Sequence, residues 1–357
     1  MNVKVLFLLV FLPFNLLAQS FSGLGSTADG FANPTPNPNF NFPLDHGPHD
    51  EYRIEWWYLT ANLLSEDQTP FGIQWTLFRT ARSPDKENGW RSNQIWFAHA
   101  AITTPKEHFT TERFARGGIG QAGVRVDPFE AWIDEWSLSG ENFEKLNLSA
   151  AGPNFAYNMS LEAEGPLVFH GENGYSVKSS EGQASYYYSQ PFFKIKGNLT
   201  LPEGDIYVEG DAWLDREWSS QPLSENQTGW DWFSLSLNNG AKLMGFQLRQ
   251  VDGSTFSSSS WIEPDGSKVS YGNNEFVALP LNLHTVGSTK LPTEWHLSLK
   301  EKKVDVIVQA INPDSWMNLS VPYWEGPVDI TGSHTGRGYL EMTGLLSLIE
   351  YSSAQRH

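Results

Sequence analysis

Two short segments place carboxylates among tryptophans in sequence that is typical of β-strands. The first is His-Asp-Glu-Tyr-Arg-Ile-Glu-Trp-Trp-Tyr-Leu-Thr at residues 49–60, and the second is Asp-Ala-Trp-Leu-Asp-Arg-Glu-Trp-Ser-Ser at residues 211–220. A carboxylate that is buried without a partner is costly, so this pattern needs a physical reason. Either the acids pair with arginines and stabilise the fold, or a desolvated acid has a raised pKa and can donate a proton.

Side chains alternate between the two faces of a strand, which assigns each acid to a face. In the first segment, Glu55 falls on an apolar face that we expect to be internal. In the second segment, Asp215 and Glu217 share a face with Trp213, whereas Arg216 points to the opposite, apolar side. The face that carries Asp215 is therefore either exposed to solvent or the wall of a cavity with polar groups.

The structural interpretation of these acids is that Glu55, Asp215 and Glu217 form ion pairs with nearby arginines. The candidate partners are Arg53, Arg79, Arg216 and Arg249. The functional interpretation is that one acid stays unpaired and protonated. Both interpretations are correct if one acid is paired with an arginine and another acid is unpaired.

The elements that must position these acids are β-strands. Stretches of five to nine residues rich in aromatic and β-branched side chains recur between Gly, Asn, Asp and Pro, and helical periodicity is nearly absent. The clearest stretches are 56–64, 71–80, 94–102, 131–137, 155–162, 192–199, 206–214, 230–237, 243–250, 294–299, 305–310 and 338–344. The sequence therefore predicts an all-β chain built from antiparallel meanders.

The 357 residues exceed one ordinary barrel or sandwich, so we expect two β-domains, 44–200 and 201–357. The turn Leu-Pro-Glu-Gly-Asp at residues 201–205 lies at the boundary. Residues 21–43 are rich in Asn, Pro and Gly and are expected to form an extended arm.

The aromatic content exceeds what a β-core requires. The chain has 15 Trp, 22 Phe and 12 Tyr, which favours an aromatic-lined cavity even though each ring alone is more often part of a core. His99 lies in a strand that is apolar on both faces and has either a structural or a site role. The candidate ligand-binding residues are Trp57, Trp75, His99, Tyr186, Tyr188, Trp213, Trp218, Trp232, Phe246 and Trp324.

The segment Asp45-His46-Gly47-Pro48-His49-Asp50 contains residue types that ligate metals. Gly-Pro between the histidines favours a turn, and the helical spacing of strong zinc motifs is missing. We therefore expect hydrogen-bonding roles here and predict neither a metal nor a cofactor.

The N-terminal sequence and the composition indicate where the protein is located and which partners are unfavourable. A single Lys4, the apolar stretch 5–14 and the small residues Ala18 and Ser20 predict a cleaved signal peptide at residues 1–20, and thus a periplasmic or secreted protein. The chain contains no Cys, so its stability must come from its core. A net charge of −17 argues against nucleic acid as a partner.

Several motifs, taken in order, resemble the AttH-like family, which is related to carotenoid 1,2-hydratase and often labelled "predicted secreted hydrolase". They are Asp-His-Gly-x-His at 45–49, Glu-Trp-Trp-Tyr-Leu-Thr at 55–60, Asp-Arg-Glu-Trp-Ser-Ser at 215–220, Gly-Trp-Asp-Trp-Phe-Ser-Leu at 229–235, Leu-Met-Gly-Phe-Gln-Leu-Arg at 243–249, Pro-Tyr-Trp-Glu-Gly at 322–326 and Gly-Arg-Gly-Tyr-Leu-Glu-Met-Thr-Gly at 336–344. The resemblance covers the chain from about residue 41. It implies two lipocalin-like antiparallel β-barrel domains packed together.

The resemblance also implies a chemistry, the addition of water to a carbon–carbon double bond of an isoprenoid. A neutral carboxylic acid protonates the alkene, aromatic faces stabilise the carbocation, and water captures it. Asp215 is the preferred acid from its place in the Asp-Arg-Glu-Trp motif, with Glu217 and Glu55 as second choices.

Three functional hypotheses remain open from the sequence. The first is an enzyme that hydrates or hydrolyses a hydrophobic ligand such as an isoprenoid or a lipid. The second is a non-catalytic carrier of such a ligand, and the third is an accessory module of an envelope transport system that binds a protein partner. A serine-nucleophile hydrolase is the weakest version, because no Ser lies in a nucleophile-elbow context. The sequence does not define the oligomeric state.

Overall fold

The computed structural model describes residues 28–221, 223–286 and 289–344. The signal peptide expected at residues 1–20 lies outside this part of the chain. Residues 28–43, within the expected arm, carry no helix or strand. No helix in the described ranges is long and apolar enough to cross a membrane.

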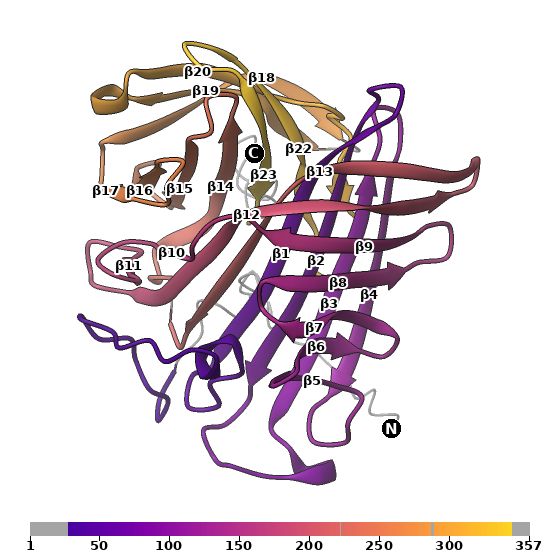
Figure 1. The fold of residues 1–357 in the computed structure, drawn as a ribbon. Coiled ribbons are helices and arrows are strands. Elements are labelled where there is room, and N and C mark those ends of the chain that lie inside the picture. The colour runs from indigo at the N-terminus through magenta and orange to yellow at the C-terminus, as the bar shows by residue number, and fades with distance from the viewer. Residues whose placement is uncertain (1–27, 222, 287–288, 345–357) are drawn as a thin grey trace, which may run out of the picture.

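The described strands form two antiparallel sheets (Figure 1). The first sheet runs in the order β4-β3-β2-β1-β13-β12-β9-β8-β7-β6-β5, and β10 and β11 also pair with β12. Its strands are β1 (Ile54–Ser65), β2 (Pro70–Ala81), β3 (Gln94–Thr103), β4 (His108–Arg116), β5 (Ala122–Val126), β6 (Phe129–Ile133), β7 (Trp136–Asn142), β8 (Lys145–Ala151), β9 (Ala156–Ala163), β10 (Val168–Phe169), β11 (Tyr175–Val177), β12 (Ala184–Leu201) and β13 (Gly204–Ser219).

The second sheet runs in the order β17-β16-β15-β14-β23-β22-β20-β19-β18, with β21 paired to β22. Its strands are β14 (Gln227–Leu237), β15 (Lys242–Gln250), β16 (Thr255–Ile262), β17 (Lys268–Tyr271), β18 (Phe276–Val286), β19 (Thr289–Leu299), β20 (Val304–Ala310), β21 (Trp316–Met317), β22 (Tyr323–Gly332) and β23 (Gly336–Met342). Short 3-10 turns occur at η2 (Leu44–His46), η3 (Gly89–Arg91) and η4 (Lys300–Lys302).

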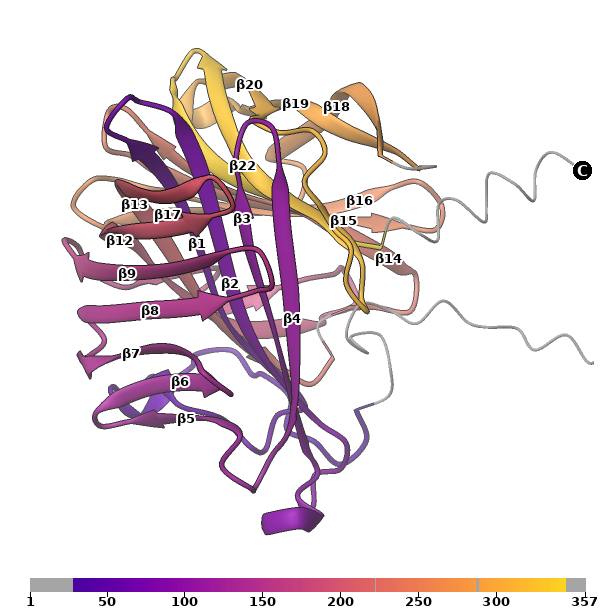
Figure 2. The ribbon, with the colours of Figure 1, turned by 90° about the vertical axis from the view of Figure 1, so that its right-hand side faces the viewer.

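Both sheets curl. The first forms a nearly closed barrel, because β6 folds back to contact β2, β3 and β4, and the second forms a half-barrel. Figure 2 shows β5 to β9 running across the direction of β1 to β4, which is how the long sheet bends over itself. The all-β, lipocalin-like prediction is confirmed.

Alternation along the strands builds three apolar layers from the two sheets. Trp57 and Leu59 of β1 point into the core of the first sheet, and Phe233 and Leu235 of β14 point into the core of the second. On each strand, the residues that alternate with these core residues point out of the core, toward the junction where the convex surfaces of the two sheets meet. This third layer includes Tyr58, Tyr187, Trp213, Trp232, Phe246 and Tyr339.

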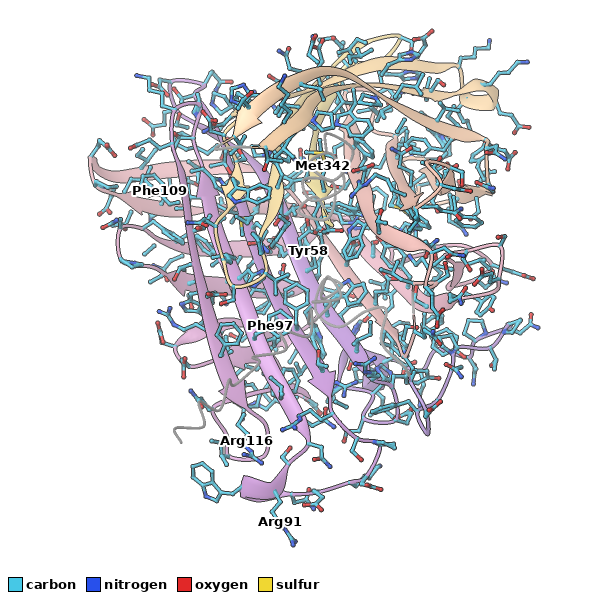
Figure 3. All side chains as sticks on the ribbon, turned by 180° about the vertical axis from the view of Figure 1, so that it is seen from behind. Tyr58, Arg91, Phe97, Phe109, Arg116 and Met342 are labelled. Atoms are coloured by element: carbon cyan, nitrogen blue, oxygen red, sulfur yellow. The ribbon has the colours of Figure 1, made fainter. Side chains whose placement is uncertain are left out.

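The sheets approach each other closely along part of this junction. A Cβ placed on Gly72 of β2 would lie 2.7 Å from the Pro327 ring of β22 and 2.8 Å from the Tyr339 hydroxyl. Glycine is therefore required there because any side chain would push the sheets apart. Tyr58 of β1 and Met342 of β23 mark the two sides of the junction in Figure 3.

Strand β12 changes register at Pro191, between Gln190 and Phe193. Proline lacks the N–H that a ladder needs, so a bulge at this point is expected. The bulge divides β12 into a part that pairs with β10 and β11 and a part that pairs with β9. The sequence predicted a strand only from residue 192, whereas the strand continues through Pro191 and begins at Ala184.

One predicted strand, 131–137, is wrong. The chain forms two strands here, β6 and β7, separated by a turn in which Asp134 has a φ of 50°. Strand β13, which follows the domain boundary expected at residue 201, belongs to the first sheet, and the second sheet begins at Gln227. The division into domains stays a prediction.

Candidate functional site

A pocket lies in the junction between the two sheets. Its cavity volume is about 90 Å³, and the empty space in and around it, including the part open to solvent, is about 840 Å³. The first sheet contributes β1, β2, β12 and β13, and the second contributes β14, β15 and β23. Seven of its eighteen lining residues are aromatic, namely Trp56, Tyr58, Phe78, Tyr187, Trp230, Trp232 and Phe246, and Ile54, Leu223 and Leu248 add aliphatic surface. The pocket is therefore distinct from the core inside either sheet.

Asp215 reaches this pocket from β13 and is 2 % exposed. Its Oδ1 accepts hydrogen bonds from the Ser189 hydroxyl and from Trp213 Nε1 at 2.6 Å, and its Oδ2 accepts one from the Tyr187 hydroxyl at 2.8 Å. No ion pair joins Asp215 to any residue in the described ranges. Burial raises the pKa of Asp215 to about 7, although the three hydrogen bonds favour the ionised form.

Behind Asp215, a buried chain of hydrogen bonds leads to the second sheet. Ser189 donates to Asp215, so its oxygen accepts from His170 Nε2 at 2.6 Å, and His170 Nδ1 accepts from the Ser260 hydroxyl at 3.0 Å. These directions assign His170 as the neutral tautomer protonated at Nε2. Burial holds the pKa of His170 well below its usual value, consistent with a neutral ring.

Glu217 also faces the pocket, but it is paired. Its Oε1 lies 2.9 Å from Lys178 Nζ and accepts a hydrogen bond from the Ser185 hydroxyl. The ammonium group of Lys178 also lies over the rings of Phe246 and Tyr187, at 4.3 and 4.8 Å from their centroids. Glu217 is thus neutralised by a cation, in contrast to Asp215 two residues earlier.

Glu341 of β23 is a third acid of the pocket wall, opposite the first sheet. Its Oε1 accepts a hydrogen bond from Trp230 Nε1 at 2.6 Å. Directly beside it in the strand register is Glu325, whose carboxylate accepts a hydrogen bond from the Tyr58 hydroxyl. Burial raises the pKa of Glu341 to about 7 and that of Glu325 well above its usual value.

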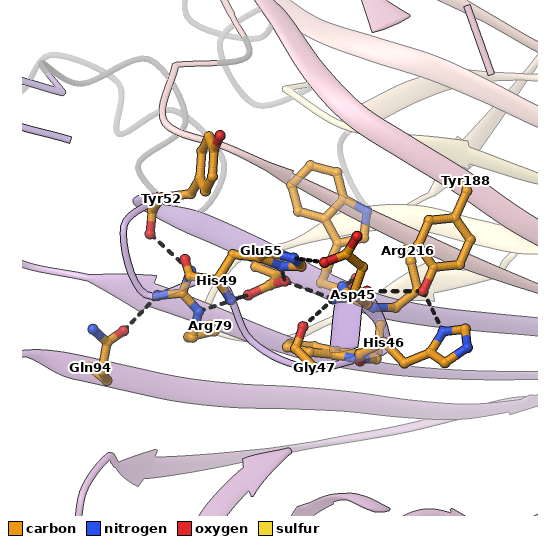
Figure 4. A network of polar contacts seen from close by, with 12 residues as sticks. Asp45, His46, Gly47, His49, Tyr52, Glu55, Arg79, Gln94, Tyr188 and Arg216 are labelled. Atoms are coloured by element: carbon orange, nitrogen blue, oxygen red, sulfur yellow. Dashed lines mark hydrogen bonds and ion pairs between the residues drawn. The ribbon is translucent and has the colours of Figure 1, made fainter. Parts of the chain in front are cut away.

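Glu55 has a different environment from the other acids (Figure 4). Its carboxylate lies 2.7 Å from Arg216 Nη2, 3.0 Å from Arg79 Nε and 2.6 Å from His49 Nδ1. Burial alone would raise the pKa of Glu55, but Arg216, His49 and Arg79 together hold it well below its usual value. Glu55 is therefore ionised and cannot donate a proton at neutral pH. The structural interpretation holds for Glu55.

The structure brings only part of the predicted site together. Asp215, Glu217, Trp232 and Phe246 line the pocket, Glu55 lies at its edge, and Trp213 donates to Asp215. The other candidates lie elsewhere. Trp57, Trp75, Tyr188 and Trp218 are in the core of the first sheet, with Tyr186 packed against it, and Trp324 is in the core of the second sheet.

His99 and the histidines of the Asp-His-Gly-Pro-His segment make specific contacts. His99 Nδ1 lies 2.9 Å from the Tyr323 hydroxyl, at the junction between the sheets. His46 stacks on Phe143 at 3.8 Å between ring centroids, and His49 stacks on Trp218 at 3.9 Å. Within the described ranges, no group of three or more potential ligands is arranged to hold a metal ion.

Sequence reasoning missed several pocket residues, namely Lys178, Tyr187, Trp230, Glu341 and, behind the wall, His170 and Ser189. One signal was available for Tyr187. In the run Tyr186-Tyr187-Tyr188, alternation places the middle ring opposite its neighbours, and Tyr187 pairs in register with Glu217. Glu341 and Trp230 lay in motifs of the family resemblance, but nothing in the sequence placed them near Asp215.

Two curled antiparallel sheets, a barrel and a half-barrel with an aromatic pocket between them, define a lipocalin-like β-protein. The profile of the AttH-like family matches residues 33–345. The chain belongs to the AttH-like family.

Comparison with solved structures supports this assignment. A candidate AttH protein from Nitrosomonas europaea is 30% identical, with a TM-score of 0.79, and the match covers 88% of this chain and 100% of that one. Kievitone hydratase from Nectria haematococca shares the fold at 12% identity, with a TM-score of 0.67 and coverage of 88% and 95%. CghA, solved with Sch210972, matches at 10% identity and a TM-score of 0.53, with coverage of 90% and 96%. Comparison with curated protein sequences found no match.

Proposed function

We propose that this protein binds a hydrophobic, isoprenoid- or lipid-like ligand in the pocket between its sheets and adds water to a carbon–carbon double bond, with Asp215 as the acid. One observation carries the proposal. Asp215 is buried at an aromatic pocket and forms no ion pair within the described residues, whereas the neighbouring acids Glu217 and Glu55 are both paired with cations. The fold shared with kievitone hydratase agrees with this chemistry.

The reaction has three balanced steps. The proton of the neutral Asp215 carboxyl group passes to one alkene carbon, which leaves a carbocation on the other carbon and a carboxylate on Asp215. Water attacks the carbocation and forms a new carbon–oxygen bond. The proton that the bound water then loses returns to Asp215, so the net reaction is alkene plus water to alcohol. An acid with a pKa near 7 suits such a step, because both of its protonation states are populated at neutral pH.

The aromatic wall supplies the stabilisation that a carbocation needs. The ammonium group of Lys178 already covers Phe246 and Tyr187, so the rings left for a carbocation are Trp56, Tyr58, Phe78, Trp230 and Trp232. Aromatic faces attract cations by about 0.5–2 kcal/mol without forming a bond to them. The wall therefore fits a cationic intermediate without trapping it.

The N-terminal leader expected from the sequence supports an exported, periplasmic or secreted location as part of this proposal. A ligand from the cell envelope would fit such a location. Fractionation of the native host, with the protein followed by an antibody, tests the location separately from the chemistry.

The test begins with the protein purified from its own host, from which any bound molecule is extracted and identified by mass spectrometry. That molecule, or an isoprenoid alkene if none is recovered, is incubated with the protein in water enriched in oxygen-18. We expect an alcohol that carries one labelled oxygen, and no product with Asp215→Asn. A ligand that is bound and returned unlabelled would contradict hydration and favour the carrier hypothesis instead.

A further inference from the structure

The charged side chains of the pocket wall limit the chemical class of its ligand. Four acids line the pocket, namely Asp215, Glu217, Glu341 and, at its edge, Glu55, and Glu325 lies beside Glu341. Lys178 and Arg79 are the cations that line it. Whether either cation is free to bind an acidic ligand decides which ligands the pocket accepts.

Lys178 is already engaged on two sides. Its Nζ lies 2.9 Å from Glu217 Oε1 and over the rings of Phe246 and Tyr187, and both members of the ion pair are buried. The single charge of Lys178 is therefore already balanced by Glu217. A ligand carboxylate or phosphate would either displace Glu217 from a buried ion pair or add a second buried anion beside one cation, and both are unfavourable.

Arg79 is committed to the opposite face of its strand. Its Nε pairs with Glu55, its Nη1 donates to the Gln94 side chain at 2.7 Å, and its Nη2 donates to the carbonyl oxygens of His49 and Tyr52. Every nitrogen of the guanidinium group therefore has an acceptor, and four of its five N–H groups are used. The charge of Arg79 is balanced by Glu55 and does not serve the pocket.

The backbone offers no substitute for a cation. Most pocket residues lie within strands, where the N–H groups belong to ladders, and the helices in the described ranges are 3-10 turns of three residues. Anion sites built from backbone N–H groups need a helix N-terminus or a nest. An acidic group in this pocket would therefore be desolvated beside Asp215 and Glu341 without a compensating charge.

The geometry points to a ligand that is uncharged where it meets the acids, such as a neutral isoprenoid alkene or alcohol, and to a pocket that rejects carboxylate and phosphate ligands. The pocket therefore disfavours fatty acids, phospholipids and prenyl diphosphates in any orientation that places their anionic group against these acids. This inference rests on the proposed function, because it narrows the ligand of the same pocket.

The test compares two probes that differ in one group. Farnesol and farnesoic acid have the same carbon chain, and isothermal titration calorimetry at pH 8 measures the affinity of each when the acid is ionised. We expect farnesol to bind at least about tenfold more tightly, since tenfold corresponds to about 1.4 kcal/mol. Equal affinities would overturn the inference but leave the proposed hydrophobic pocket standing, whereas binding of neither probe would contradict both.

A matched pair of variants tests the physical cause. Glu217→Gln keeps the shape of the side chain and frees Lys178, so we expect the affinity for farnesoic acid to rise by about tenfold relative to that for farnesol. The double variant Glu217→Gln/Lys178→Met should lose this gain. A gain that persists in the double variant would overturn the role assigned to Lys178. The wild-type comparison decides the selectivity itself, even if a variant fails to fold.

Discussion

Asp215 and Arg216 are neighbours in the chain, yet their charged groups lie on opposite faces of β13. The Asp215 carboxyl group faces the pocket between the sheets, whereas the Arg216 guanidinium group pairs with Glu55 at 2.7 Å on the other face. Arg216 also lies over the Trp57 ring, at 3.9 Å from its centroid. Strand alternation thus keeps the nearest arginine in the sequence from neutralising the proposed acid.

The raised pKa of Asp215 should make the protein less stable at higher pH. The pKa of about 7 in the folded state exceeds the usual value of 3.8, so between these values the folded state binds more protons and stability falls as pH rises. This contribution is complete below about pH 4 and lost above about pH 7. One pKa unit is about 1.4 kcal/mol, so the loss is on the order of 4 kcal/mol.

Asp215→Asn removes this titration. From pH 4 to pH 8 we expect the stability of the variant, relative to the wild type, to rise by a few kcal/mol. Urea unfolding at several pH values, followed by circular dichroism, measures the change. A constant difference between the two proteins across this range would show that Asp215 keeps an ordinary pKa.

Ser189→Ala should shift the pH dependence of turnover. Ser189 donates a hydrogen bond to Asp215 Oδ1 and so favours the ionised form. Without this bond the pKa of Asp215 rises, and the fall in activity on the alkaline side moves to higher pH. We expect the alkaline limb of the pH profile to move by about 0.5–1 pH unit, because this shift equals the free energy that one hydrogen bond contributes.

Ser185→Ala is the matched control for that experiment. Ser185 lies four residues earlier on the same strand and donates to Glu217 instead of Asp215. Its loss should leave the alkaline limb of the profile where it is in the wild type. Equal shifts in both variants would assign the effect to the general surroundings and not to the Ser189 bond.

Glu55→Gln should destabilise the fold. The substitution leaves Arg79 and Arg216 buried without their shared anion, which costs about 3–5 kcal/mol. Asp211→Asn on β13 breaks the exposed ion pair with Lys194 on β12 and should cost less than about 1 kcal/mol. Chemical denaturation of both variants at pH 7 makes the comparison, and similar small losses would contradict a structural role for Glu55.

The aromatic wall of the pocket can be separated from the core by two Trp→Phe substitutions. Trp232 lines the pocket and donates to the Tyr187 hydroxyl, whereas Trp75 is fully buried in the first sheet. We expect Trp232→Phe to weaken farnesol binding by about tenfold and Trp75→Phe to leave it unchanged while lowering stability by about 1–3 kcal/mol. Calorimetry and thermal unfolding measure the two effects. Weaker binding in Trp75→Phe alone would place the ligand inside the barrel.

Strand alternation predicted the faces of β1 and β13 correctly. Glu55 lies on the apolar face, and Trp213, Asp215 and Glu217 share the opposite face with Arg216 behind them. The sequence left two alternatives for the face of β13 that carries Asp215, namely exposure to solvent or the wall of a cavity. Each holds in one half of the strand, because Tyr207 is 44 % exposed whereas Asp215 is buried at the pocket. Local periodicity is sufficient for such assignments because it depends only on neighbouring residues.

The partners across the pocket could not be predicted in the same way. Trp230, Trp232 and Glu341 face Asp215 because the convex sides of two sheets meet, and this docking depends on contacts distant in sequence such as Gly72 with Pro327. Whether a given tryptophan belongs to a core or to the pocket follows from that docking. Trp75, Trp324 and Trp232 accordingly look alike in the sequence but lie in three different layers.

The use of both faces of the same strands has a consequence for how this protein can change over evolution. Odd-numbered positions of β1 hold the barrel together, whereas even-numbered positions such as Trp56 and Tyr58 shape the pocket. Selection for a new ligand can therefore act on one set of positions while the other set maintains the fold. Such a division allows the pocket to diversify rapidly on a scaffold that stays the same.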